Sequence, residues 1–71
     1  MITLTEQLAE ARRELALRRK CYPQWVQSGK LDVGEAHDQL QAMEAIVQTL
    51  QKLDIAQRQL SLFTTHHEGP A

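Results

Sequence analysis

Apolar side chains recur at alternating steps of four and three residues over the first third of the chain. The row consists of Leu4, Leu8, Ala11, Leu15, Arg18, Tyr22 and Trp25. This spacing places the row on one face of an α-helix, like the heptad seam of a coiled coil, with Arg18 as its one charged member. Thr3 and Glu6 form a capping box that marks the start. The pattern predicts a helix over about residues 4–28.

Pro23 falls inside this helical pattern. A proline in a helix has no amide hydrogen, and its ring clashes with the carbonyl of the residue four positions before, here Arg19. The helix is expected either to kink near Cys21 and Tyr22 or to break there, with Pro23 opening a last short turn. Gly29, which accepts a left-handed backbone conformation, is expected to end this helix.

A second helix is predicted over about residues 33–63, with Asp32 and Glu35 as another capping box. Its first apolar seam consists of Val33, Ala36, Leu40, Met43, Val47 and Leu50. A second, overlapping line consists of Ile46, Leu50, Leu53, Gln57 and Leu60. The apolar face is therefore broader than one neighbouring helix needs. Residues 64–71 show no periodicity, and we expect a disordered tail there.

Residues 29–31 alone separate the two helices, and so short a link joins antiparallel neighbours. The predicted fold is therefore an all-α, antiparallel two-helix hairpin. Facing residues have numbers that add up to roughly 61, so Leu15 faces Ile46 and Leu8 faces Leu53. Two helices cover each other on one side only, so we expect a homodimer with a four-helix arrangement. The expected core and dimer seam consists of Leu8, Leu15, Leu40, Met43, Ile46, Val47, Leu50 and Leu53.

The composition limits what the chain can be. It has 71 residues, a net charge of −1 and a single cysteine, Cys21, so an internal disulfide cannot form. An unpaired cysteine favours a reducing, cytoplasmic compartment. No apolar run has the length of a membrane span, and the amino terminus has no signal-peptide pattern, so we expect no membrane partner. The charge balance gives no indication of nucleic-acid binding.

The sequence contains no pattern that predicts catalysis or metal binding. His37, His66 and His67 have no cysteine or carboxylate at ligand spacing. Cys21 has no general base beside it in the sequence. Phosphate-binding loops, dinucleotide turns and nucleophile elbows are absent, and a two-helix hairpin offers no concave substrate pocket. We therefore expect a protein that is not an enzyme and that takes no cofactor and no metal.

Five residues are candidates for contacts with another protein. Tyr22 and Trp25 belong to the types that dominate interface hot spots, although they could instead seal the turn of the hairpin. Arg18 could bind a partner, or it could pair with Glu14 or Glu44 within the hairpin. Leu60 and Phe63 extend beyond the first helix as exposed apolar surface, which commonly marks a contact site.

A basic stretch offers an alternative, because it could contact nucleic-acid phosphates. It consists of Arg12, Arg13, Arg19 and Lys20. Acidic residues are interleaved with it at Glu6, Glu10 and Glu14. This mixture of charges favours a solvated helix face over a nucleic-acid-binding surface.

The central block of the chain resembles a known group of proteins. Residues 22–31 read YPQWVQSGKL, Ala36 follows, and MEAI and TL occupy residues 43–46 and 49–50. This pattern, within about residues 12–53, is similar to small uncharacterised proteins that are common in bacteriophage and prophage genomes. The group has no agreed activity, so no functional residue can be transferred from it.

The resemblance implies a phage context, in which small early proteins often bind and block host proteins. The first hypothesis is a phage accessory protein that binds and inhibits a host bacterial protein with a role in defence, regulation, quorum sensing or motility. The second is a structural or assembly module of the phage. The third is a nucleic-acid-binding regulator that uses the basic stretch.

Overall fold

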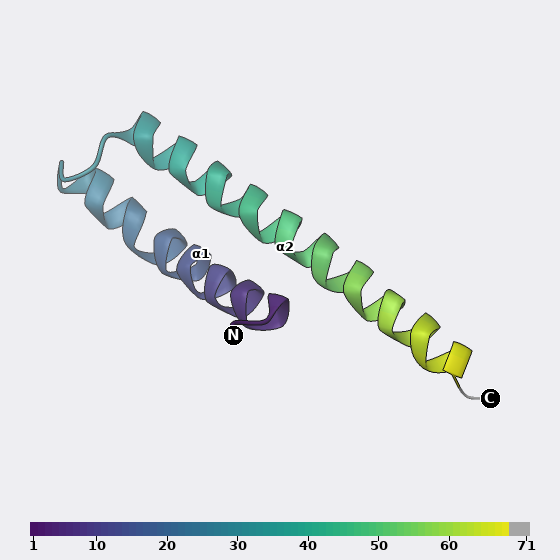
Figure 1. The fold of residues 1–71 in the computed structure, drawn as a ribbon. Helices are drawn as coiled ribbons and strands as arrows, with labels where there is room; N and C mark the ends of the chain where they lie inside the picture. The colour runs from purple at the N-terminus through teal and green to yellow at the C-terminus, as the bar shows by residue number, and fades with distance from the viewer. Residues whose placement is uncertain (69–71) are drawn as a thin grey trace.

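Two antiparallel helices joined by a short turn make up the computed structural model (Figure 1). It describes the backbone of residues 1–68 and the side chains of residues 1–62. Helix α1 spans Leu4–Gln27 and helix α2 spans Val33–Glu68. The predicted all-α hairpin is confirmed. Because α2 has 36 residues and α1 has 24, α2 runs past the amino terminus of α1.

Both helices begin at the predicted caps. The Thr3 hydroxyl oxygen accepts a hydrogen bond of 3.1 Å from the amide of Glu6. The Asp32 carboxylate accepts from the amides of Gly34 and Glu35, at 3.0 and 3.2 Å. Each cap satisfies amides that have no partner within the first turn of a helix. The start of each helix is therefore encoded locally.

The turn that ends α1 is a Schellman motif. The amide of Lys30 donates to the carbonyl of Trp25 at 2.8 Å, and the amide of Gly29 donates to the carbonyl of Val26 at 3.1 Å. Gly29 has a φ of 79°, a left-handed conformation that costs a residue with a Cβ atom about 1 kcal/mol or more. The prediction that Gly29 ends the helix is confirmed.

Pro23 lies within α1 without dividing it. The helix continues from Leu4 to Gln27, so the alternative in which Pro23 opens a separate turn is wrong. The carbonyl of Arg19 receives no amide hydrogen from residue 23, because proline has none. Packing of α1 on α2 therefore keeps this part of the helix intact despite the missing hydrogen bond at Pro23.

The core lies along one seam of each helix. It consists of the buried side chains Leu8, Ala11, Leu15, Met43 and Val47, with Leu40 and Leu50 packed against them. Hydrogen bonds across the hairpin join Tyr22 to Gln39 and Arg19 to Glu44. These pairs agree with the predicted register to within about two residues. The core includes six of the eight residues named for the core and dimer seam: Leu8, Leu15, Leu40, Met43, Val47 and Leu50. Ala11, a member of the first apolar row, joins them.

Two residues predicted to face α1 do not lie in the core. Ile46 and Leu53 are 48% and 49% exposed, whereas Asp54 is only 4% exposed. Asp54 lies four positions after Leu50, so it continues the row of α2 that faces α1, and Ile46 and Leu53 lie on the flank of that row. Val33, the first member of the predicted seam, is also exposed, at 68%.

Helix α2 ends later than the sequence pattern suggested. The prediction placed its end near residue 63 and a disordered segment at 64–71, but α2 runs to Glu68. Residues 64–68 include no glycine or proline, and Gly69-Pro70 is the first pair that stops a helix. The end of α2 is therefore set by the glycine and proline that follow it, and the loss of apolar periodicity after residue 63 was the wrong criterion. Residues 69–71 lie outside the described part of the chain.

Candidate protein-binding surface

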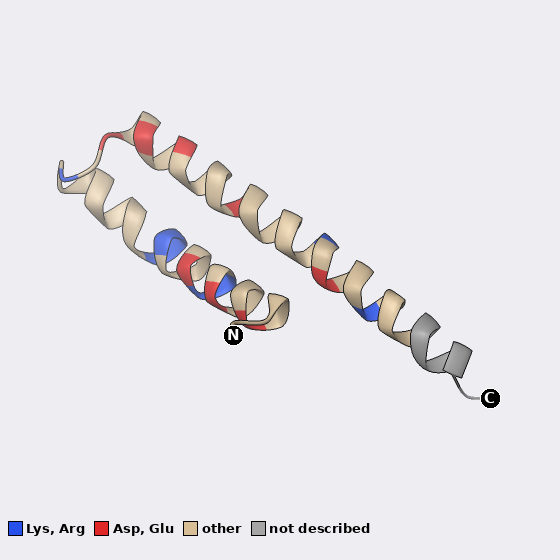
Figure 2. Cartoon of the chain, in the orientation of Figure 1, with Lys and Arg blue, Asp and Glu red and all other residues tan. Residues whose placement is uncertain are grey.

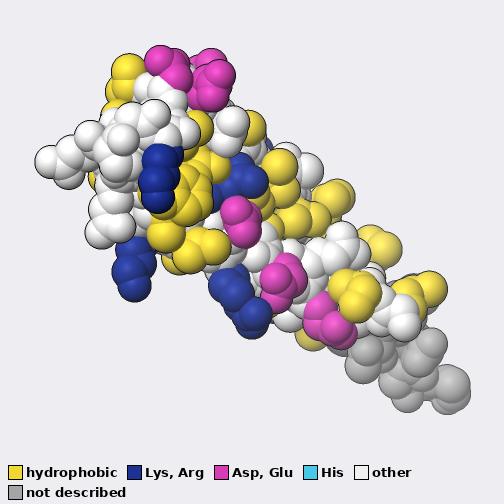
Figure 3. Space-filling model, turned by 90° about the vertical axis from the view of Figure 1, so that its left-hand side faces the viewer, with side chains coloured by type: hydrophobic (Ala, Val, Ile, Leu, Met, Phe, Trp, Pro, Cys, Tyr) yellow, Lys and Arg dark blue, Asp and Glu magenta, His cyan; other side chains and the backbone are white. Residues whose placement is uncertain are grey.

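An apolar groove opens beside the turn of the hairpin, between the end of α1 and the start of α2. We call it the tip groove, and it is lined by Tyr22, Pro23, Val26, Val33, Ala36, His37 and Leu40. Its volume is about 280 Å³. Seen from the turn, the molecule shows hydrophobic side chains among the charged ones at this end (Figure 3). The tip therefore offers apolar surface that the hairpin itself does not cover.

Tyr22 and Trp25 pack together at this end. Tyr22 is only 7% exposed, and its hydroxyl donates to the side-chain oxygen of Gln39 at 2.9 Å. The Trp25 ring lies 5.6 Å from the Tyr22 ring, centroid to centroid, and 41% of Trp25 is exposed. Tyr22 thus closes the core of the turn, as one alternative expected, and it supports a tryptophan that is available to a partner.

Arg18 is held inside the hairpin by three groups. Its Nε atom lies 2.8 Å from a Glu14 carboxylate oxygen, and Nη1 donates to the carbonyl of Gln39 at 3.2 Å. Its guanidinium carbon is 6.0 Å from the centroid of the Tyr22 ring. The expected pairing with Glu14 is confirmed. The structure places Arg18 under the tip as a support for Tyr22 and the backbone of α2.

The charges are unevenly distributed between the helices (Figure 2). Acidic residues gather at the start of α2, as Asp32, Glu35 and Asp38. On α1, Arg13 pairs with Glu10 at 3.2 Å and Arg19 pairs with Glu44 at 2.8 Å. Carboxylates thus partly neutralise the basic stretch that was considered for nucleic acid. The tip groove therefore has an acidic neighbourhood on the α2 side.

Pro23 is the residue of the tip that local physics disfavours most. A proline in a helix interior costs about 3 kcal/mol relative to alanine. Pro23 is exposed and contributes to the wall of the tip groove, so it does not fill the core. Residues that violate local rules without a structural gain concentrate at functional sites. Pro23 therefore marks the tip groove as the first candidate for a binding surface.

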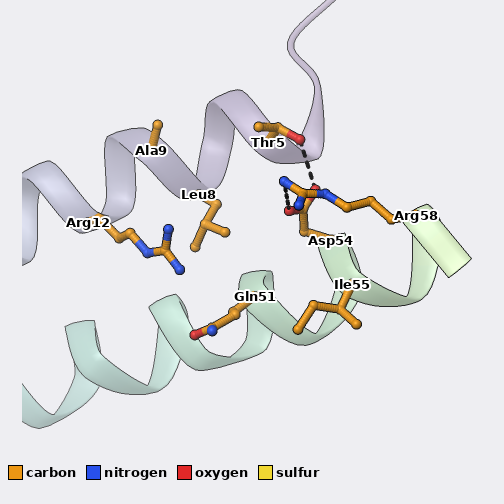
Figure 4. A pocket seen from close by; sticks show the side chains of 8 residues that line it. All are labelled: Thr5, Leu8, Ala9, Arg12, Gln51, Asp54, Ile55 and Arg58. Atoms are coloured by element: carbon orange, nitrogen blue, oxygen red, sulfur yellow. Dashed lines mark hydrogen bonds and ion pairs between the residues drawn. The ribbon is translucent and has the colours of Figure 1, made fainter.

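A second hollow, of about 350 Å³, lies near the amino terminus of α1 (Figure 4). There the buried carboxylate of Asp54 accepts from the Thr5 hydroxyl at 2.8 Å and pairs with Arg58 at 3.0 Å. The side chain of Arg12 extends into the gap between the helices in the same view. Asp54 was not among the residues predicted from the sequence, although its spacing of four from Leu50 and seven from Val47 was a usable signal.

The overhanging part of α2 carries exposed apolar side chains, as expected. Leu60 is 70% exposed, and so is Leu62. Phe63 lies in α2, but its side chain is outside the described residues. The candidates therefore fall at two separate places: Arg18, Tyr22 and Trp25 lie near the turn, and Leu60 lies near the far end of α2.

Neither a metal centre nor a membrane span is found in the part of the chain that the structure describes. Among these residues, no three His, Cys, Asp or Glu side chains come together as a metal site. The side chains of His66 and His67 lie outside the described residues. Neither helix is both long enough and apolar enough to cross a membrane within the same part of the chain.

Comparisons with protein-family models, with curated proteins and with solved structures gave no match. The function is therefore inferred from the surfaces of this chain. The resemblance to phage and prophage proteins rests on the sequence pattern alone.

Proposed function

We propose that this chain is a phage-encoded accessory protein that binds a host bacterial protein in the cytoplasm and inhibits it. Contact is made by the tip groove and Trp25, with Arg18 and Tyr22 holding this surface in place. The observation that carries the proposal is the exposed Pro23, a costly residue in the interior of α1 that contributes to an apolar groove. The phage context comes from the sequence resemblance.

The mechanism follows from the shape of the tip. Trp25 offers a large, partly exposed ring on one helix, and Val33 offers an apolar side chain on the other. A partner helix or loop with apolar side chains would bury both, and the Tyr22 hydroxyl bond to Gln39 keeps the groove preformed. Inhibition would be steric, because the hairpin covers a surface that the host protein needs for another partner.

The homodimer with a four-helix arrangement is part of the same proposal. A dimer that leaves the turn uncovered would present two copies of the tip. Two tips would strengthen the attachment to a host protein that is itself oligomeric.

The test is capture of host proteins from a bacterial lysate with tagged wild-type protein and two variants, followed by mass spectrometry. Val33→Glu places a charge in the tip groove, and a glutamate in the first turn of α2 is compatible with the helix dipole. Leu17→Glu is the control, because Leu17 is 52% exposed and does not line the tip groove. We expect one stoichiometric host protein with the wild type and Leu17→Glu, and its loss with Val33→Glu.

Other outcomes would favour a different binding site or a different function. Capture that is equal for Val33→Glu and the wild type would remove the tip groove from the binding site. Recovery of phage structural proteins in large assemblies would favour the assembly hypothesis. Salt-sensitive binding of DNA would favour the regulator hypothesis.

A further inference from the structure

A second heptad row runs along α2, on the flank of the face that packs on α1. We call it the α2 seam, and it consists of Ala42, Ile46, Thr49, Leu53, Ala56 and Leu60. All six residues are exposed, and Ile46 and Leu53 are 48% and 49% exposed. No member carries a charge. A row of this period, at steps of four and three, is the pattern by which one helix packs lengthwise on another.

The accessible surface of the chain is larger than a compact protein of this size has. It measures 5872 Å², and the molecule extends over 64 × 18 × 17 Å. The scaling for compact monomers gives about 4500 Å² at this mass. The difference, about 1400 Å², exceeds the roughly 800 Å² that each partner buries in a standard interface. This surplus is spread over the whole elongated chain, and it is large enough to include an interface of standard size with a second copy.

We propose that the α2 seam binds a second copy of this chain, with the two α2 helices antiparallel. This inference deepens the dimer of the proposed function by naming the face and the direction of pairing. The large members of the row, Ile46, Leu53 and Leu60, all occupy one heptad position. The small members, Ala42, Thr49 and Ala56, all occupy the other.

This division into large and small residues selects the antiparallel arrangement. Antiparallel helices place the two heptad positions opposite each other, so a layer formed by two of these six residues joins a large side chain to a small one. Parallel helices pair each position with itself, which sets Leu53 against Leu53 and leaves under-filled layers at Ala56 and Thr49. Interfaces approach the packing density of protein interiors, so the arrangement without under-filled layers is favoured.

One register satisfies the charges and the shape as well. It sets Leu53 against Ala56 of the partner subunit and Thr49 against Leu60 of the partner subunit. A hollow lined by Gln7, Ala45, Ile46, Thr49 and Leu50 lies beside Thr49 and receives that leucine. Lys52 is the charged residue closest to the centre of the α2 seam. In this register it lies near Gln59 of the partner subunit, so the Lys52 side chains of the two copies do not meet at the two-fold axis of the dimer.

The first experiment measures the mass in solution by sedimentation equilibrium for the wild type and two variants of matched exposure. Leu53→Glu places a charge on the α2 seam, whereas Ile55→Glu places one on the opposite flank of the same helix, where Ile55 is 48% exposed. We expect twice the chain mass of 8.1 kDa for the wild type and for Ile55→Glu. Leu53→Glu should weaken dimerisation about a hundredfold or more, because each dimer loses two buried leucines.

Circular dichroism on the same samples identifies any variant that loses helix. If Leu53→Glu loses helix, Leu53→Ala replaces it, and a weaker dimer with unchanged helix content is the expected result. A monomeric wild type, or equal dissociation by Ile55→Glu, would overturn the proposal. A single tip groove can contact a host protein without the dimer, so capture by a monomeric variant would overturn only the dimer and the two proposals fail separately.

The second experiment tests the direction of pairing. In a Cys21→Ser background, the variants Leu53→Cys and Ala56→Cys are mixed and oxidised. Antiparallel pairing predicts that the disulfide between the two different variants forms in excess over the disulfides within each variant. A preference for like-with-like disulfides would show parallel pairing and overturn the antiparallel assignment.

Discussion

The hydroxyl of Thr5 donates a 2.8 Å hydrogen bond to the buried carboxylate of Asp54, 49 positions away in the sequence. The bond ties the first turn of α1 to the middle of α2. The other carboxylate oxygen lies 3.0 Å from a guanidinium nitrogen of Arg58, whose side chain is 67% exposed. Asp54 thus occupies a core-facing position of α2 with both oxygens satisfied, and it opposes sliding of one helix along the other.

Loss of the Thr5 hydroxyl is therefore expected to destabilise the hairpin. Thr5→Val keeps the shape of the side chain and leaves one oxygen of the buried Asp54 without its donor. The expected loss is about 1–2 kcal/mol in the free energy of unfolding, measured by urea denaturation at a fixed protein concentration. Arg58→Gln should cost less, because the arginine is largely exposed and its ion pair is screened by water.

The matched control is the double substitution with Asp54→Leu. Leucine fills the core-facing position and removes the carboxylate, so Asp54→Leu alone should be neutral or stabilising. In that background Thr5→Val should cost almost nothing, because the hydroxyl no longer has a buried partner. An equal cost of Thr5→Val in both backgrounds would contradict the importance of this bond.

The core seam predicts a contrast between two leucines of α1. Leu15 is 7% exposed and lies in the core, whereas Leu17 is 52% exposed. Leu15→Ala should cost about 2–4 kcal/mol, a large part of the stability of so small a hairpin. Leu17→Ala should change the free energy of unfolding by less than about 0.5 kcal/mol. Thermal unfolding followed by circular dichroism distinguishes the two, and equal effects would contradict the assigned core.

The fold could be predicted because its determinants are local. Thr3 and Asp32 cap their own helices, and Gly29 takes the left-handed conformation that ends α1. The heptad spacing from Leu8 to Tyr22 needs no knowledge of the rest of the chain. The short link then fixes the antiparallel arrangement.

The candidate surfaces could not be predicted as fully as the fold. The apolar face of α2 is broad, and apolar character alone does not show which side of it packs on α1. Leu53 and Asp54 are adjacent in the sequence, and Leu53 was predicted to lie in the core because it is apolar. The structure buries Asp54, because Thr5 and Arg58 satisfy its carboxylate. Thr5 is 49 positions away from Asp54, so no local pattern reports this hydrogen bond, although the spacing of Asp54 from Leu50 and Val47 places it on the row that faces α1. The tip groove likewise exists only once Val33 and Pro23 come together.

The left-handed turn at Gly29 gives a further prediction. An added Cβ atom would meet nothing within 4 Å, so the cost of Gly29→Ala comes from the backbone conformation alone. We expect a loss of about 1–2 kcal/mol in the free energy of unfolding. Gly29→Asn should cost less, because asparagine tolerates this conformation better. Alanine and asparagine of equal stability would contradict the role of the left-handed turn.

Pro23 gives the prediction that joins stability to function. Pro23→Ala restores the amide that the carbonyl of Arg19 lacks and removes the clash of the ring with that carbonyl. The gain is partly offset, because alanine leaves the unfolded chain more freedom than proline does. We expect a net increase of about 1–2 kcal/mol in the free energy of unfolding, measured by urea denaturation.

The same substitution removes part of the wall of the tip groove. Capture of the host protein by Pro23→Ala should therefore weaken even though the hairpin is more stable. This opposite response separates the proposal from a purely structural role, in which stability and capture would rise or fall together. A Pro23→Ala variant that is more stable and binds as well as the wild type would show that Pro23 contributes neither to the stability of the hairpin nor to binding. The assignment of the tip groove would then depend on Val33 and Trp25 alone.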